Sequence, residues 1–99
     1  MKATCLLFSI LLTATMSFAK GDANAGKAKA GTCTACHGQN GVSDNDLWPN
    51  LKGQKAGYLL QALKDFKSGA RKNSLMSPQA QTLSDADMEN LAAYFSSLK

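Results

Sequence analysis

The chain has 99 residues, of which 44% are hydrophobic and 18% are charged, so it can form one small domain with a hydrophobic core. It carries 11 Lys and Arg against 7 Asp and Glu, which gives a formal net charge of +4. The single histidine and the two prolines exclude a centre of two or three histidines, a C2H2 zinc finger and proline-rich disorder.

The start of the chain, residues 1–19, is expected to be a cleaved secretory signal peptide. Lys2 supplies a positive charge, an apolar stretch runs over 3–14, and small residues precede the expected cleavage point after Ala19. A membrane anchor is the alternative, but the stretch is shorter than the roughly 18 apolar residues of a spanning helix. Cleavage leaves residues 20–99 as one exported domain.

The predicted elements of the exported domain begin with a short helix over 23–30. Asp22 can cap this helix at its start, and Gly31 can end it. The cysteine motif described below follows at once. A loop with three glycines and one proline is then expected over 38–53, because these residues favour turns over regular structure.

The clearest helix is predicted over 55–68, where apolar residues recur at helical spacing: Leu59, Leu63 and Phe66. A polar loop is expected over 70–83. Ser84 then caps a last helix, with Asp87 three residues on as its partner in a capping box. An apolar stripe predicts the buried residues of that helix: Met88, Leu91, Ala92, Phe95 and Leu98. Since no segment alternates like a strand, the predicted fold class is all-α.

The chemistry of the chain is concentrated in Cys33-Thr34-Ala35-Cys36-His37, a C-x-x-C-H motif. This pattern is the attachment signature of a c-type haem. Two thiols at this spacing can add to the two vinyl groups on one edge of the ring, and the histidine that follows can reach the iron. Haem c is attached outside the bacterial cytoplasm, which agrees with the predicted export signal.

Three other uses of the two cysteines stay open from the residues alone. A thioredoxin-like redox pair expects a strand before the motif, whereas a helix is predicted there. A zinc site needs four ligands, and the motif supplies three, so a carboxylate would have to complete it. A plain disulfide between Cys33 and Cys36 would close a very small loop and would stabilise the fold little.

The second axial ligand is expected by elimination, because the chain has no second histidine. A methionine thioether is the usual partner of histidine in electron-transfer haems. Met76 and Met88 remain after processing, and Met88 lies on the predicted apolar stripe, where core packing explains it. Met76 lies in the polar loop, which Pro78 can stiffen, so Met76 is the expected ligand. Lys72 is a lesser alternative.

Nearly the whole exported part of the chain is similar to one family. The matching segments are G-D-A-N-A-G-K, C-T-A-C-H-G-Q-N-G, W-P-N-L-K-G-Q, Y-L-L-Q-A-L-K-D-F-K-S-G, the loop around Met76, and L-S-D-A-D-M-E-N-L-A-A-Y-F. On these residues the chain resembles a class I c-type cytochrome, of the small bacterial c553 or single-domain c4-like kind. The resemblance implies three to five helices wrapped around one covalently bound haem c. One departure is Ser74, where relatives often carry proline.

The resemblance implies a set of residues that hold the haem and its iron: Cys33, Cys36, His37, Met76, Pro49 and Leu51. The two cysteines would form the covalent bonds, and His37 and Met76 would be the axial ligands. The carbonyl of Pro49 would accept a hydrogen bond from the other ring nitrogen of His37, which fixes the ring. Leu51 would press on the haem face.

The resemblance also implies a close helix crossing at Gly26, against Leu91 and Tyr94, because glycine lets two backbones approach. Further side chains would cover the haem: Trp48, Leu51, Tyr58, Leu59, Leu63 and Phe66. Since the haem would form the core of so small a domain, we predict that the chain without haem is poorly folded.

The function implied by the resemblance is that of a monomeric one-electron carrier in the periplasm, not of an enzyme. With both axial positions filled, the iron has no site for a substrate, and the electron would pass at the exposed haem edge. A haem peroxidase or a gas sensor is the alternative if Met76 does not bind. A fixed electron-transfer subunit of a larger complex is another.

The expected partners are redox proteins with acidic docking faces, because basic residues can ring the haem edge. These residues are Lys27, Lys29, Lys52, Lys55, Lys64, Lys67, Arg71 and Lys72. An ordinary solvated surface is the alternative explanation. Nucleic-acid binding is not expected, because the basic residues are spread out without interleaved aromatic residues. No membrane span is expected after processing.

Overall fold

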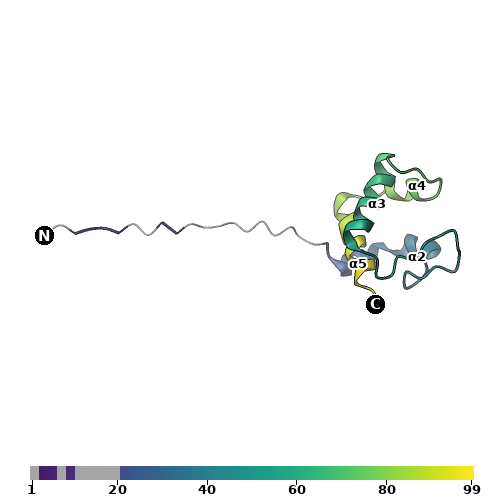
Figure 1. Ribbon diagram of the computed structural model, residues 1–99, viewed down its shortest axis with the longest axis horizontal. Coiled ribbons are helices and arrows are strands. Elements are labelled where there is room, and N and C mark those ends of the chain that lie inside the picture. The colour runs from purple at the N-terminus through teal and green to yellow at the C-terminus, as the bar shows by residue number, and fades with distance from the viewer. Residues whose placement is uncertain (1–2, 7–8, 11–20) are drawn as a thin grey trace.

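The computed structural model describes residues 3–6, 9–10 and 21–99 (Figure 1). Most of the predicted signal peptide, including the cleavage point after Ala19, lies outside these residues, so its removal stays a prediction. Within the described ranges, we find no helix with the length and apolar character that crossing a membrane requires.

Five helices and no strand are present in residues 21–99, the part of the domain that the structure describes. Their bounds are α1 Ala23–Lys29, α2 Gly31–His37, α3 Ala56–Ser68, α4 Met76–Gln81 and α5 Asp85–Ser97. Figure 1 shows α3 and α5 side by side, with α2 near one end of this pair and α4 near the other. The all-α prediction with three to five helices is confirmed.

The first and last helices pack against each other. The side chain of Asp22 caps α1 as predicted, since Oδ1 accepts hydrogen bonds from the N–H groups of Asn24 (2.9 Å) and Ala25 (3.4 Å). Gly26 lies at the crossing, where an added Cβ would fall 2.0 Å from the carbonyl oxygen of Asn90 and 2.8 Å from the Cβ of Tyr94. The close approach implied by the resemblance is therefore present, and it requires a glycine.

The start of α5 is the capping box that the sequence predicts. The N–H of Asp87 donates to the Ser84 hydroxyl at 3.0 Å, and the N–H of Ser84 donates to the Asp87 carboxylate at 3.0 Å. The predicted stripe of α5 forms much of the core, with four buried residues: Met88, Leu91, Ala92 and Phe95. Leu98, the fifth predicted member, lies just beyond the helix as its C-cap and is only partly buried. Since Met88 is only 1% exposed, core packing explains it.

The helix predicted over 55–68 is α3, which begins one residue later. Leu59 and Phe66 are buried, and Leu63 is partly buried. Gly69 ends the helix with a left-handed backbone (φ 87°), and its N–H donates to the Asp65 carbonyl at 3.1 Å.

The first helix ends before Gly31 as the sequence predicts, since α1 stops at Lys29 with Ala30 as its C-cap, but a second helix was not predicted at Gly31. The chain turns once at Ala30 and then begins α2 at Gly31, because the N–H groups of Cys33 (2.9 Å) and Thr34 (3.0 Å) donate to the Ala30 carbonyl. The cysteine motif is therefore helical.

The polar loop predicted over 70–83 is also corrected, since α4 occupies its second half. Six residues with two polar glutamines and one serine form too short and too polar a segment for periodicity to detect. Pro78 is compatible with this helix because it lies in the first turn, where an N–H has no partner within the helix.

Candidate functional site

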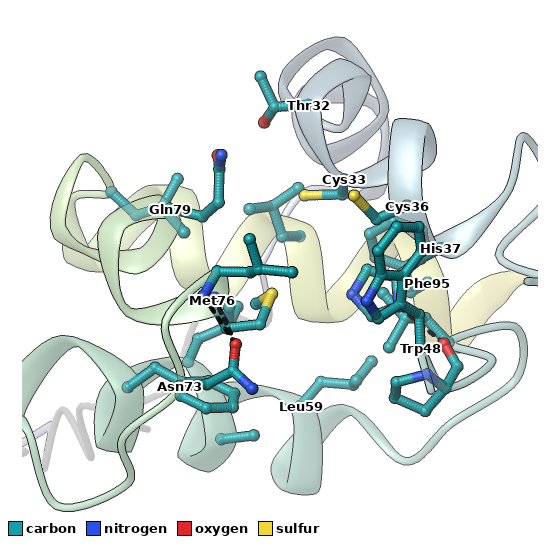
Figure 2. Close-up of a pocket in the computed structure, with 18 of the residues that line it drawn as sticks. Thr32, Cys33, Cys36, His37, Trp48, Leu59, Asn73, Met76, Gln79 and Phe95 are labelled. Carbon is teal, nitrogen blue, oxygen red and sulfur yellow. Dashed lines mark hydrogen bonds between the residues drawn. The ribbon is translucent and has the colours of Figure 1, made fainter. Parts of the chain in front are cut away.

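A cavity lies among α2, α3, α4 and α5 and the loop before α3 (Figure 2). Its lining is mainly apolar, and every residue that the resemblance placed around a haem contributes to it: Trp48, Leu51, Tyr58, Leu59, Leu63 and Phe66. An apolar cavity of this kind can bind a flat organic group and exclude water from it.

Cys33 and Cys36 both lie on α2, and their sulfur atoms lie together at one edge of the cavity (Figure 2). The two residues are three apart, so the helix places them on the same face. Both are free thiols. Burial raises the pKa of the Cys33 thiol, and a hydrogen bond with the Thr32 side chain opposes part of that shift.

The alternatives to haem attachment find little support in this geometry. The thiols are not joined, as a structural disulfide would require. No strand precedes the motif within residues 21–99, as a thioredoxin-like setting would require. Within the described residues, no three or more His, Cys, Asp and Glu side chains are grouped so that they could hold a metal ion, as a zinc site would require.

His37 is the last residue of α2 and is only 6% exposed. Its Nδ1 lies 2.7 Å from the carbonyl oxygen of Pro49. A carbonyl can only accept, so Nδ1 carries the proton and donates it, which leaves Nε2 as the ring nitrogen that could bind a metal. This contact fixes both the tautomer and the plane of the ring, as a metal-binding histidine requires.

Hydrogen bonds within the loop hold Pro49 in position. The N–H groups of Leu51 (2.8 Å) and Lys52 (3.0 Å) both donate to the carbonyl of Gly41. Asn50 accepts a hydrogen bond from the N–H of Ser43 at 2.7 Å. These bonds tie the residues that follow Pro49 to the start of the loop, and the Pro49 carbonyl faces the histidine.

Met76 is the first residue of α4 and is partly buried. Figure 2 shows its side chain on the side of the cavity opposite His37. An imidazole nitrogen and a thioether sulfur on opposite sides of an apolar cavity are the types of donor that a haem iron for electron transfer takes.

The remaining lining also suits a haem. Arg71 is the one Lys or Arg among the described residues that line the cavity, and its guanidinium lies 4.5 Å from the centroid of the Phe66 ring. A haem carries two propionate groups, and an arginine fork is suited to bind a carboxylate. The cavity therefore combines two thiols, a histidine nitrogen, a methionine sulfur, an apolar wall and a positive group, all of which fit haem c.

Three further residues that line the cavity were not predicted from the sequence: Asn73, Leu75 and Gln79. The signal for Asn73 was present, because asparagine three residues before a helical position commonly caps a turn. Leu75 and Gln79 carried no such signal, since their place depends on the path of α4.

Comparisons with known proteins agree with this geometry. The family described as Cytochrome c matches residues 23–99. Cytochrome c-554(548) of Halomonas halodenitrificans is 50% identical over 80 residues, which cover 78% of this chain and 96% of that protein. Cytochrome c4 of Pseudomonas aeruginosa is 45% identical over 97 residues, which cover 95% of this chain and 48% of that protein.

A solved structure of reduced recombinant cytochrome c4 from Pseudomonas stutzeri has a TM-score of 0.76 and 44% sequence identity, and covers 80% of this chain and 46% of that chain. The chain thus spans nearly all of one relative and about half the length of the cytochromes c4 that it matches. From the match of the family and the identity to these relatives, the chain belongs to the cytochrome c family, whose members hold haem c covalently and carry electrons between redox partners.

Proposed function

We propose that this chain is an exported one-electron carrier of the periplasm, in which Cys33 and Cys36 attach haem c and His37 and Met76 ligate its iron. The observation that carries the proposal is the placement of His37 and Met76 on opposite sides of one apolar cavity that has both thiols at its edge. Haem c, when bound, supplies an iron that changes its oxidation state by one electron.

The residues of the chain favour electron transfer over substrate chemistry. His37 is held by Pro49 and Met76 is held at the start of a helix, so neither donor has to move when the charge on the site changes. Fixed ligands keep the reorganisation small, and two protein ligands leave no open position for a substrate. The apolar walls exclude water from the site. These features support an electron-transfer protein and not an enzyme.

The proposed partners are redox proteins with acidic docking faces that bind this chain as a monomer. Lys29 pairs with Asp87 at 3.7 Å, and the Lys67 ammonium donates to the Leu83 carbonyl, so both have a partner within the domain. Arg71 lines the cavity, where it can bind a haem propionate, and Lys72 is exposed next to it. We propose that Lys72 contributes to docking and that salt weakens this docking. Four other exposed lysines can contribute in the same way: Lys27, Lys52, Lys55 and Lys64.

The test of the ligand assignment is an absorption spectrum of the protein made with the c-haem maturation machinery. We expect a low-spin haem with a far-red band from the methionine–iron bond in the wild type. Met76→Ala should lose the band, and Met88→Leu should keep it, because Met88 is a buried core residue of similar volume. A band that persists in Met76→Ala, or ready binding of CO by the reduced wild type, would contradict the proposal.

A further inference from the structure

The segment before Met76 is held by hydrogen bonds to a single residue, Asn73. The Asn73 side-chain oxygen accepts from the N–H groups of Leu75 and Met76, each at 2.9 Å (Figure 2). The Asn73 carbonyl accepts from the N–H of Ser77 at 3.0 Å. In return, the N–H of Asn73 donates to the Ser77 hydroxyl at 3.0 Å.

These bonds satisfy the start of α4. The first N–H groups of a helix have no partner within it and need one from outside. Here the side chain and the carbonyl of Asn73 serve Met76 and Ser77, the first two residues of the helix. The third residue, Pro78, has no N–H to satisfy. The position at which α4 begins is thus set by Asn73 and Pro78 together.

The other end of α4 is held by contacts with α3. The Gln81 side chain donates to the Lys67 carbonyl at 2.6 Å, and Ala80 is fully buried. A helix of six residues is too short to be stable by itself, so its ends depend on such external contacts. At the end that carries Met76, the hydrogen bonds of Asn73 fill this role.

We propose that Asn73 is a positioning residue for Met76: it holds the methionine backbone so that the sulfur stays at the iron instead of yielding to water or another ligand. It acts through Met76 and does not touch the iron. This inference rests on the proposed function, because it needs Met76 to be an axial ligand.

The test measures how easily imidazole replaces the methionine on the oxidised iron, by titration followed in the absorption spectrum. We expect Asn73→Ala to bind imidazole about ten-fold more tightly than the wild type, since it loses the two hydrogen bonds that hold Met76 in its ligating position. Asn73→Asp keeps an acceptor oxygen and should bind imidazole like the wild type. A residue with a purely structural role would lower the thermal midpoint without changing imidazole affinity.

The matched control is Asn45→Ala. The Asn45 side-chain oxygen accepts from the N–H of Leu47 at 2.8 Å. The variant therefore loses a hydrogen bond of the same kind, two residues apart, in the loop that leads to Pro49. Its imidazole affinity should stay at the wild-type value. Equal affinity in Asn73→Ala and the wild type, or an equal rise in Asn45→Ala, would overturn the inference.

If Asn73→Ala does not retain haem, Ser77→Ala decides the question. This variant removes the acceptor of the Asn73 N–H and should bind imidazole about three-fold more tightly than the wild type, whereas an unchanged affinity would overturn the inference. Met76→Ala tests the ligand assignment separately from the role of Asn73. If it binds imidazole no more tightly than the wild type, the ligand assignment itself fails, independently of Asn73.

Discussion

The crossing of α1 with α5 and the cavity among α2, α3 and α4 differ in what fills the space between their elements. At the crossing, the backbone at Gly26 lies against the carbonyl of Asn90, and on α5 Met88 is only 1% exposed. At the cavity, apolar side chains of α3 and α5 face an open space between His37 and Met76.

One half of the domain is packed by its own residues, and we predict that the other half depends on the haem to complete its core. Apolar surface that faces a cavity contributes little to stability until something covers it. The haem would then be both the redox centre and part of the core.

The largest effect should come from removing the haem. The double variant Cys33→Ser, Cys36→Ser cannot form the covalent bonds, so the cavity stays without its core, and we expect a chain without a cooperative thermal transition. Far-UV circular dichroism during a thermal scan measures this. Ala35→Ser is the control, because it adds a hydroxyl at an exposed position of the same helix and keeps both thiols. A haem-free protein with native-like helix content and a cooperative transition would contradict the prediction that the cavity half depends on the haem.

A smaller effect is expected at the packed crossing. In Gly26→Ala the new Cβ would lie 2.0 Å from the Asn90 carbonyl oxygen, so the helices must move apart. We expect the free energy of unfolding of the haem protein to fall by about 3 kcal/mol. Urea unfolding of the holoprotein measures it.

The control for Gly26→Ala is Gly57→Ala in α3. An added Cβ at Gly57 meets nothing within 4 Å, so the only change is the higher helix propensity of alanine, which should stabilise the protein by about 0.5 kcal/mol. Equal effects of the two substitutions would contradict the tight packing inferred for the crossing.

The smallest effect concerns pH at the start of α5. A hydrogen bond from the Ser84 backbone N–H lowers the pKa of the Asp87 carboxyl, and the Ser84 hydroxyl and Lys29 add to the shift. A carboxyl with a lowered pKa in the folded state stabilises the protein above its unfolded pKa, and this contribution is lost as the pH falls below about 4.

Asp87→Asn should therefore unfold at a lower urea concentration than the wild type at pH 7, and this difference should shrink at pH 3. Urea midpoints at both pH values measure it. Asp46→Asn removes the same charge from the loop of the cavity half and serves as the control. If both variants show the same dependence on pH, the capping box is not its source.

Much of the site could be predicted from the sequence, and the errors have a common cause. The C-x-x-C-H motif indicated the cofactor because the chemistry of attachment requires that spacing within a few residues. Met76 followed from the absence of a second histidine and from the core position of Met88. In contrast, α2 and α4 were missed as helices. Hydrogen bonds to the Ala30 carbonyl stabilise α2, whereas α4 is held by hydrogen bonds to Asn73 and to α3. Such bonds leave no periodic pattern in the sequence.

By itself, the sequence determined the helix caps at Asp22 and Ser84, the buried stripe of α5 and the C-x-x-C-H motif, because each is a pattern among residues close together along the chain. Only the tertiary structure decided which way these groups face. It placed the Pro49 carbonyl on His37, set Arg71 over Phe66, and held the start of α4 so that Met76 faces the cavity. Such contacts depend on how separate elements pack, and local sequence patterns do not encode that packing.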